Sequence, residues 1–218
     1  GQIIVAALLV NFGIKINIIP YPLISIPITI LWIVAVVNSF NLLDNMDGLS
    51  GGIGAIVGLI LFLFSALNGN FEVGLPALIL AGSLLGFLKY NFNPAQIFMG
   101  DSGSMFIGFM LSAITLQGSW KEPAHLVMVL LIPLLILAVP IFDTMFVTLM
   151  RSFNSRKIFQ GGKDHISHRM VVLGLSEKKT VIALYVISAI FGGISILSMF
   201  VSPIITTILI LLAVIGII

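Results

Sequence analysis

PITILWIVAVVNSFNLLDNMDGLSGGIGAIVGLILFLFSAL, residues 27–67, contains two long apolar runs on either side of a short polar stretch. The runs 27–37 and 53–67 carry no charged residue, and Asp44 and Asp47 lie between them. A membrane-spanning helix needs about 20 mostly apolar residues, so each run, with its flanks, is long enough to cross a bilayer. The stretch therefore predicts two membrane helices joined by an acidic link.

The composition of the whole chain extends this prediction. Of its 218 residues, 59% are hydrophobic and 8% are charged, whereas soluble domains carry about 25% charged residues. The mean hydropathy is +1.22, and the apolar runs are continuous rather than alternating, which argues against a β-barrel. The chain has no cysteine and therefore no disulfide. We expect an all-α integral membrane protein in which residues 1–218 form a single transmembrane domain.

Apolar runs recur along the chain and predict a polytopic bundle of seven or eight transmembrane helices. Their expected positions are 1–13, 24–42, 50–67, 74–90, 103–119, 124–148, 180–201 and 203–218. The last two runs can form one hairpin that turns at Ser202 and Pro203. Pro133 and Pro140 interrupt the sixth run, and each removes a backbone hydrogen bond, so we expect a kinked helix there.

Positive charge is concentrated in one link, residues 149–179, which holds seven of the ten lysines and arginines. Cytoplasmic loops carry an excess of these residues, so we expect this basic, histidine-containing loop in the cytoplasm. Because each span changes the side, links 43–49 and 91–102 are expected on the same side. The outer links are then 14–23, 68–73 and 120–123. Three segments that carry acids, amides or histidines are thus predicted to converge on one face.

Polar side chains recur every third residue through the first of these segments, at Asn38, Asn41, Asp44 and Asp47. If the preceding helix continues, they lie on one broad face of it. An aspartate or asparagine before an apolar helix often serves only as its N-cap, but one residue suffices for that role. Two aspartates and two asparagines favour a functional site.

The second segment, NFNPAQIFMGDSGS at 91–104, places Asp101 at the start of an apolar run and before small residues. A helix N-terminus favours anions, and a carboxylate there favours Mg²⁺, a hard cation that often bridges to substrate phosphates. Phe98 is a candidate for stacking on a nucleobase. The alternative interpretation is that Asp101 is an N-cap and Phe98 faces lipid.

The third segment, KDHISHR at 163–169, pairs His165 and His168 on one face if it is helical, with Lys163 and Arg169 beside them. Two imidazoles among cations suit diphosphate binding or proton transfer. Zinc is a weaker alternative because the chain offers no cysteine. The other basic residues of this loop are expected to mark topology near anionic lipid.

Asp143, in VPIFDTMF, is an acid inside the sixth run and close to its cytoplasmic end. Acids inside membrane spans are candidates for function. The alternative is that Asp143 pairs with a lysine or arginine of the basic loop and holds that loop in place.

Together, the three segments resemble one family, the polyprenyl-phosphate N-acetylhexosamine-1-phosphate transferases. NSFNLLDNMDGLSGG is similar to the family's N-x-x-N-L-x-D-G-x-D-G-L segment, NPAQIFMGDSGS to its P-A-x-x-F-M-G-D-x-G-S segment, and DHISHR to its histidine motif. The resemblance implies that a sugar 1-phosphate passes from a UDP-N-acetylhexosamine to polyprenyl (undecaprenyl) phosphate, with release of UMP and with Mg²⁺ or Mn²⁺ as cofactor. It also implies the bacterial inner membrane with its lipids, an active site on the cytoplasmic face, no nucleic acid as partner, and a homodimer as one oligomeric form.

The resemblance also implies roles for individual side chains. Asp101 would ligate Mg²⁺, and Asp44 and Asp47, with Asn41, would hold the nucleoside or organise the site. Phe98 would stack on uracil, and the two histidines would contact the sugar diphosphate. The expected catalytic residues are thus Asp44, Asp47, Asp101, His165 and His168, and the expected substrate-binding residues are Asn38, Asn41, Asn91, Phe98, Lys163 and Arg169.

Three departures from the family pattern bear on these expectations. Ser167 replaces the middle histidine of a motif that usually reads His-Ile-His-His, and Asn45 stands where the family usually has glycine. The family also carries an Asp-Asp pair before a segment similar to residues 1–12, whereas the first acid of this chain is Asp44. We therefore expect the C-terminal part of a longer enzyme, with an inactive family member as an alternative. The G-D-S-G and D-H-x-x-H forms favour the GlcNAc-1-phosphate branch of the family.

A membrane transporter or channel is a second class of function that fits a polytopic chain. Transporters place carboxylates near the bilayer midplane, often at broken helices, whereas the acids here are predicted to gather at one interface. This distribution favours the transferase. Nucleotide binding discriminates between the two classes, because a transferase should bind UMP in the presence of Mg²⁺ and a transporter should not.

Overall fold

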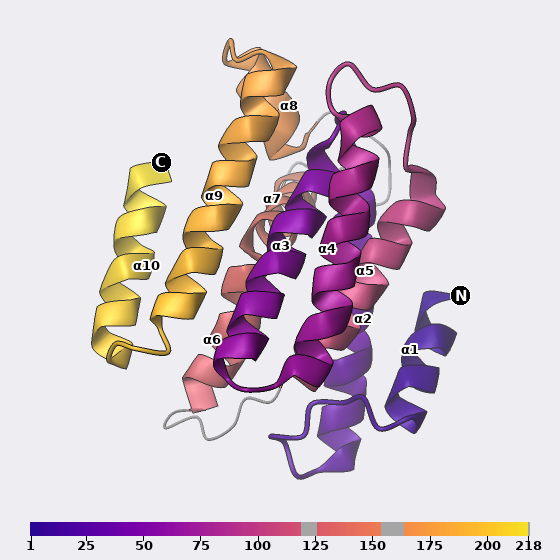
Figure 1. Ribbon diagram of the computed structural model, residues 1–218, viewed down its shortest axis with the longest axis vertical. Helices are drawn as coiled ribbons and strands as arrows, with labels where there is room; N and C mark the ends of the chain where they lie inside the picture. Colours follow the sequence, from indigo (N-terminus) through magenta and orange to yellow (C-terminus); the bar gives the residue numbers. More distant parts are fainter. Residues whose placement is uncertain (119–125, 154–163, 218) are drawn as a thin grey trace.

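The computed structural model describes residues 1–118, 126–153 and 164–217, and within these ranges every regular element is an α-helix. The helices of these ranges are α1 (Gln2–Asn11), α2 (Pro22–Leu43), α3 (Leu49–Leu67), α4 (Phe71–Asn91), α5 (Gly100–Gln117), α6 (Leu126–Ile136), α7 (Ala138–Phe153), α8 (Ile166–Val172), α9 (Glu177–Leu197) and α10 (Pro203–Ile217). The long helices lie side by side along one direction and form a bundle (Figure 1). The prediction of an all-α fold is confirmed.

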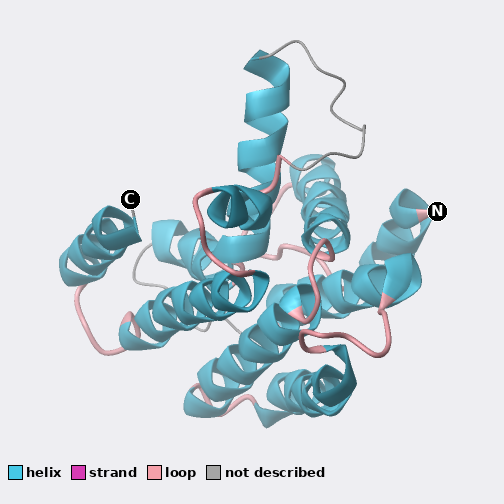
Figure 2. Cartoon of the chain, turned by 90° about the horizontal axis from the view of Figure 1, so that it is seen from above, coloured by secondary structure: helices cyan, strands magenta, loops and turns pink. Residues whose placement is uncertain are grey.

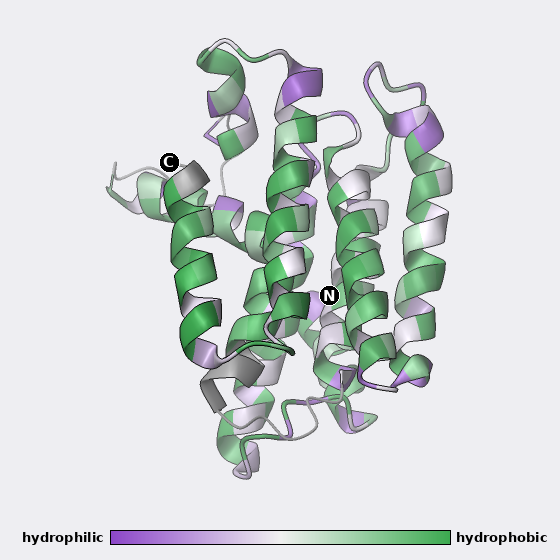
Figure 3. Ribbon diagram, turned by 60° about the vertical axis from the view of Figure 1, so that its left-hand side comes forward, coloured by the Kyte–Doolittle hydropathy of each residue, from purple (hydrophilic) through white to green (hydrophobic). Residues whose placement is uncertain are grey.

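The surface of the bundle has the polarity that a bilayer requires. Four helices of the described residues, α2, α3, α4 and α9, are long and apolar enough to cross a membrane, and α1 and α10 are shorter apolar helices. Hydrophobic residues cover the bodies of the helices, and hydrophilic residues gather at the two ends of the bundle (Figure 3). Because a helix satisfies its own backbone groups, such helices can face hydrocarbon. The chain is a polytopic membrane protein, as its composition predicts.

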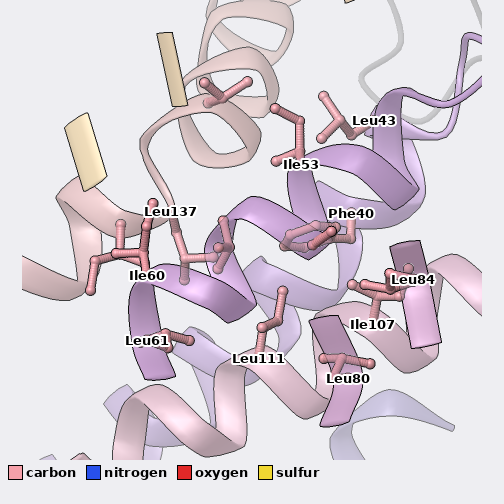
Figure 4. Packing of buried hydrophobic residues seen from close by; sticks show 14 of the residues in the cluster. Phe40, Leu43, Ile53, Ile60, Leu61, Leu80, Leu84, Ile107, Leu111 and Leu137 are labelled. Atoms are coloured by element: carbon pink, nitrogen blue, oxygen red, sulfur yellow. The ribbon is translucent and has the colours of Figure 1, made fainter. Parts of the chain in front are cut away.

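Helix α3 lies at the centre of the bundle and packs against α2, α4, α5, α6 and α9. Its buried Ile53 belongs to one core cluster with Phe40 of α2 and Leu84 of α4 (Figure 4). In lipid, such packing is held by van der Waals contact, which small residues strengthen by letting helices approach closely. At Gly108 of α5, for example, a Cβ would lie 2.7 Å from the Cα of Val37 on α2.

The run 124–148, expected as one kinked span, forms two separate helices in the structure. Helix α6 ends at Ile136, and α7 begins two residues later. Pro140 cannot donate a hydrogen bond to the carbonyl of Ile136, and its ring crowds that carbonyl, so the helix breaks at this point. From the break, α7 crosses the direction of the other helices and runs out of the bundle as far as Phe153 (Figure 1, Figure 2).

The break between α6 and α7 lies in the core, whereas the other described links lie at the two ends of the bundle (Figure 1). Links 44–48 and 92–99 lie at one end together with α8, and links 12–21, 68–70 and 198–202 lie at the other. We call the first of these the polar end. It is the end that carries the three segments singled out in the sequence.

Candidate active site

The link between α2 and α3, residues 44–48, is tied to the end of α4. Gly48 has a φ of +77°, which glycine adopts without strain, and this turn starts α3. The Gly48 N–H donates to Oδ1 of the buried Asn91 at 3.1 Å, and Nδ2 of Asn91 donates to the carbonyl of Ile97 at 2.9 Å. One amide side chain therefore joins the first polar segment to the second.

Asp47 makes a second connection between the same two segments. Its Oδ2 accepts a hydrogen bond of 2.9 Å from the N–H of Ala95. The expected polar helix face holds only for Asn38 and Asn41, because α2 ends at Leu43 and the two aspartates lie in the link beyond it. The spacing therefore did not predict the backbone conformation of the two aspartates, which lie in the link and not on the helix.

Asn41, Asp44 and Asp101 form what we call the acidic cluster, where α2 meets α5. Nδ2 of Asn41 donates to Oδ1 of Asp101 at 3.3 Å and to Oγ of Ser104 at 3.2 Å. Burial and, second, the negative charge of Asp101 raise the pKa of Asp44 from 3.8 to about 6. The two carboxylates therefore repel each other unless a proton or a cation neutralises them.

Asp101 itself is exposed and lies in the first turn of α5. Met99 is the N-cap of that helix, so the interpretation of Asp101 as a capping residue is wrong. The carboxylate is instead held from the side by Asn41 and remains open to solvent.

The oxygen atoms of the acidic cluster suit a hard divalent cation. Asp44 and Asp101 supply two carboxylates whose repulsion a cation would relieve. Among the described residues, no three His, Cys, Asp or Glu side chains are grouped so that they could hold a metal alone. This arrangement fits Mg²⁺ better than zinc, because Mg²⁺ often binds through one or two carboxylates and keeps water and substrate phosphates as its other ligands.

The histidine segment forms α8 and is held by α7. His165 is the N-cap of α8 and is 5% exposed, and its Nδ1 lies 2.7 Å from Oδ2 of Asp143. The Ile166 N–H donates to Oδ1 of the same carboxylate at 2.8 Å. Asp143 thus holds the loop in place, although through an imidazole and a backbone amide rather than a lysine or arginine. The rings of His165 and His168 lie 6.4 Å apart, centroid to centroid.

Two cationic side chains add to the connection between α7 and the histidine segment. Nε of the buried Arg151 lies 3.1 Å from Oδ2 of Asp164. The guanidinium of Arg169 lies 4.8 Å from the ring centroid of Phe146, a distance that suits a cation–π interaction. Lys163 lies outside the described residues.

A hydrogen bond also joins the third segment to the first. The hydroxyl of Ser167 in α8 donates to Oδ1 of Asn45 in the α2–α3 link at 2.7 Å. All three segments are therefore connected at the polar end, and their predicted convergence is confirmed.

Two expected substrate-binding residues lie at the margin of this arrangement. Phe98 is 77% exposed in the link between α4 and α5. Asn38 exchanges hydrogen bonds with Gln2 of α1, at 2.9 and 3.3 Å, and so connects α2 to α1. The Asn38 side chain bonds Gln2 and the Val34 carbonyl, and not Asp44 or Asp101 of the acidic cluster.

Tyr185 of α9 supports the site, although the sequence analysis did not single it out. Its hydroxyl donates to the Gly48 carbonyl at 2.5 Å, and its ring occupies the space that a Cβ at Gly52 would need. Both backbone polar groups of Gly48 are thus hydrogen-bonded, its N–H to Asn91 and its carbonyl to Tyr185. Gly51 and Gly52 indicate that another element approaches α3 closely, but no local sequence pattern identifies Tyr185 as that neighbour.

Comparison with known proteins agrees with this geometry. The sequence pattern that defines glycosyl transferase family 4 matches residues 1–119. Over 201 residues, 88% of this chain and 55% of the relative, the chain is 39% identical to the "Probable undecaprenyl-phosphate N-acetylglucosaminyl 1-phosphate transferase" of Bacillus subtilis. It is 35% identical to the "Decaprenyl-phosphate N-acetylglucosaminephosphotransferase" of Mycobacterium tuberculosis, over 93% of this chain and 57% of the relative.

A relative from another branch is more distant. The chain is 32% identical to the "Phospho-N-acetylmuramoyl-pentapeptide-transferase" of Caldicellulosiruptor bescii, over 76% of this chain and 49% of the relative. The chain thus spans about half the length of the curated relatives it matches.

Proposed function

The chain belongs to glycosyl transferase family 4, and on this premise we propose that the complete protein transfers N-acetylhexosamine 1-phosphate from a UDP-sugar to a polyprenyl phosphate and releases UMP. The names of the two relatives with higher identity favour GlcNAc 1-phosphate as the transferred group. The observation that carries the proposal is the acidic cluster, which lies where two polar links meet at one end of a membrane bundle.

The proposed reaction is a phosphoryl transfer. An oxygen of the polyprenyl phosphate attacks the β-phosphorus of the UDP-sugar, the bond from that phosphorus to the bridging oxygen breaks, and UMP leaves with the bridging oxygen. Reactants and products carry the same total charge, so no net proton has to be supplied. Catalysis of such a transfer consists mostly of positioning the two substrates and neutralising their charge.

The acidic cluster fits the second of these tasks. Asp101 would hold Mg²⁺, with the Asp44 carboxylate beside it, and the bound ion would supply positive charge where two phosphate groups meet. Asn41 holds Asp101 in place through its amide and also bonds Ser104 in the next turn of α5. The raised pKa of Asp44 fits this role, because nearby positive charge would favour its ionised form.

The other side chains of the polar end fit the positioning of the nucleotide sugar. Asp47 and Asn91 hold the two links together, and the exposed Phe98 can stack on the uracil ring. We assign the sugar diphosphate to the histidine segment, where His168 and Arg169 supply an imidazole and a guanidinium. His165 belongs to the same segment and is fixed by Asp143, and Lys163 and Asn38 complete the proposed substrate-binding residues.

The proposed location is the bacterial inner membrane, with the polar end at the cytoplasmic surface. The concentration of lysine and arginine in 149–179 supports this orientation. A membrane bundle also explains how a lipid phosphate reaches the same end as a soluble nucleotide sugar. The acids gather at that end, which favours the transferase over a transporter with carboxylates at mid-bundle.

The test of the proposed function is an assay of the complete gene product, purified in detergent and supplied with undecaprenyl phosphate. We expect UMP release with UDP-GlcNAc that requires the lipid and Mg²⁺ and stops when EDTA is added. UDP-MurNAc-pentapeptide is the comparison donor. UMP release with that donor alone would overturn the GlcNAc assignment, and no release with either donor would overturn the transferase.

A further inference from the structure

Asn45 and Ser167 are in direct contact, although they are 122 positions apart in the sequence. The hydroxyl of Ser167 donates to Oδ1 of Asn45 at 2.7 Å. Asn45 follows Asp44 directly, and Ser167 precedes His168 directly. The contact therefore joins the acid-bearing link to the histidine-bearing helix without any intermediate residue.

The orientation of both side chains is fixed by their surroundings. Nδ2 of Asn45 donates to the carbonyl of Leu42 at 2.8 Å, in the last turn of α2, so Oδ1 is the end of the amide that faces α8. An amide oxygen only accepts, so the Ser167 hydroxyl must donate to it. Ser167 is 1% exposed, and a hydroxyl that loses water on burial is costly unless it finds such a partner.

The contact leaves little room for a larger side chain at 167. An imidazole there would be longer than the serine side chain by several atoms, and the Asn45 amide lies directly against Ser167. Asn45→Gly would remove that amide, so the two exchanges compensate each other in volume.

We propose that Asn45 and Ser167 are a matched pair of positioning residues that hold α8 against the link 44–48. The pair acts at the site of the proposed function and rests on it for its effect on turnover. On its other side, α8 is held to α7 by Asp143. The short helix is thus hydrogen-bonded to two elements and also packs against α9, which together set the distance between its imidazole and the acidic cluster.

The first test is a double-mutant cycle on the complete protein, with UMP release as the readout. Asn45→Ala and Ser167→Ala should each lower kcat about tenfold, the factor that one intramolecular hydrogen bond supplies. KM for the nucleotide sugar should change less than about twofold, because the other two segments hold the nucleoside. The double variant should be no slower than either single variant, and a loss that multiplies to about a hundredfold would overturn the pairing.

The second test exchanges the pair. Ser167→His alone should lose activity because the imidazole overlaps the Asn45 amide, and the addition of Asn45→Gly should recover most of it. A double variant that is no more active than Ser167→His would overturn the proposal. The alanine cycle stays decisive if the histidine variant fails to fold.

Ser195→Ala is the matched control. Ser195 is as buried as Ser167, but its hydroxyl donates only to the Gly192 carbonyl of its own helix, so kcat should not change. Wild-type protein that releases no UMP would refute the proposed function and not the pair. In that case the same cycle is measured by thermal unfolding, where non-additive shifts support the contact and additive shifts overturn it.

Discussion

Asp101 and Asp44 carry the charges on which the proposed chemistry depends most. Asp101→Asn keeps the shape of the side chain and removes its charge, so we expect UMP release to fall at least about 100-fold, as when one charge-stabilising group is removed. Glu72→Gln is the matched control, because Glu72 lies in the first turn of α4, at the opposite end of the bundle. Full activity of Asp101→Asn would contradict the metal-ligand role, and equal losses in both variants would contradict the location of the site.

The ionised form of Asp44 fits the proposed function but is expected to lower the stability of the folded protein. Its pKa is about 6 in the folded protein against 3.8 without burial and the charge of Asp101. The folded state therefore binds this proton more tightly than the unfolded state, and stability falls as the pH rises through that interval and stays low above it. In Mg²⁺-free buffer, Asp44→Asn should raise the melting temperature at about pH 7 and raise it less at about pH 4. Equal melting temperatures of variant and wild type at the higher pH would contradict the destabilisation of the Asp44 carboxylate by burial and by the charge of Asp101.

At the level of residues, the sequence identified the acids but not their partners. The three-residue spacing of Asn41, Asp44 and Asp47 marked the first segment, and the small residues after Asp101 marked the second. The contacts that orient them, such as that between Tyr185 and Gly48, join positions far apart in the chain. No local pattern encodes such contacts, because they depend on how the helices pack.

Asp143 connects α7 to α8, which carries the histidine segment of the site. Asp143→Ala would leave Nδ1 of His165 and the N–H of Ile166 without their buried acceptor, at a cost of about 1–3 kcal/mol for each group. We expect faster hydrogen exchange of the backbone amides of α8 and a lower melting temperature. Thr144→Val is the control, since the Thr144 hydroxyl bonds only the Pro140 carbonyl of its own helix.

The same hydrogen-exchange measurement can contradict the connection of α8 to α7 through Asp143. Amides of α8 that exchange at the wild-type rate in Asp143→Ala, with exchange elsewhere also unchanged, would show that another contact holds the helix. Faster exchange in both variants would show that α7 itself had loosened.

Among the elements, those with uninterrupted apolar runs were predicted well. The runs 24–42 and 50–67 correspond to α2 and α3 within a few residues. The run 124–148 was predicted as one span, because prolines are tolerated in membrane helices. Whether a proline kinks or breaks a helix depends on whether neighbours satisfy the freed carbonyl, which periodicity does not reveal. The break at Ile136 is what lets α7 leave the bundle and hold α8.

For the molecule as a whole, the distribution of polarity explains why two aspartates stand between apolar runs. The helix bodies are hydrophobic and the polar groups lie at the ends (Figure 3). In the proposed function, a soluble nucleotide sugar meets a lipid phosphate at such an end. The three segments that carry acids, amides and histidines come together there, although Asn45 in the first and Ser167 in the third are 122 positions apart in the chain.

The measurement that tests the central claim most directly follows the β-phosphate of the donor. UDP-GlcNAc that carries radiolabelled phosphorus at the β position is incubated with the complete protein, Mg²⁺ and undecaprenyl phosphate, and the lipid and water phases are then separated. Transfer of the sugar with its phosphate predicts label in the lipid and unlabelled UMP in the water phase. Label that stays in the water phase as UDP, with the sugar on the lipid, would contradict the claim, and so would label that never leaves UDP-GlcNAc.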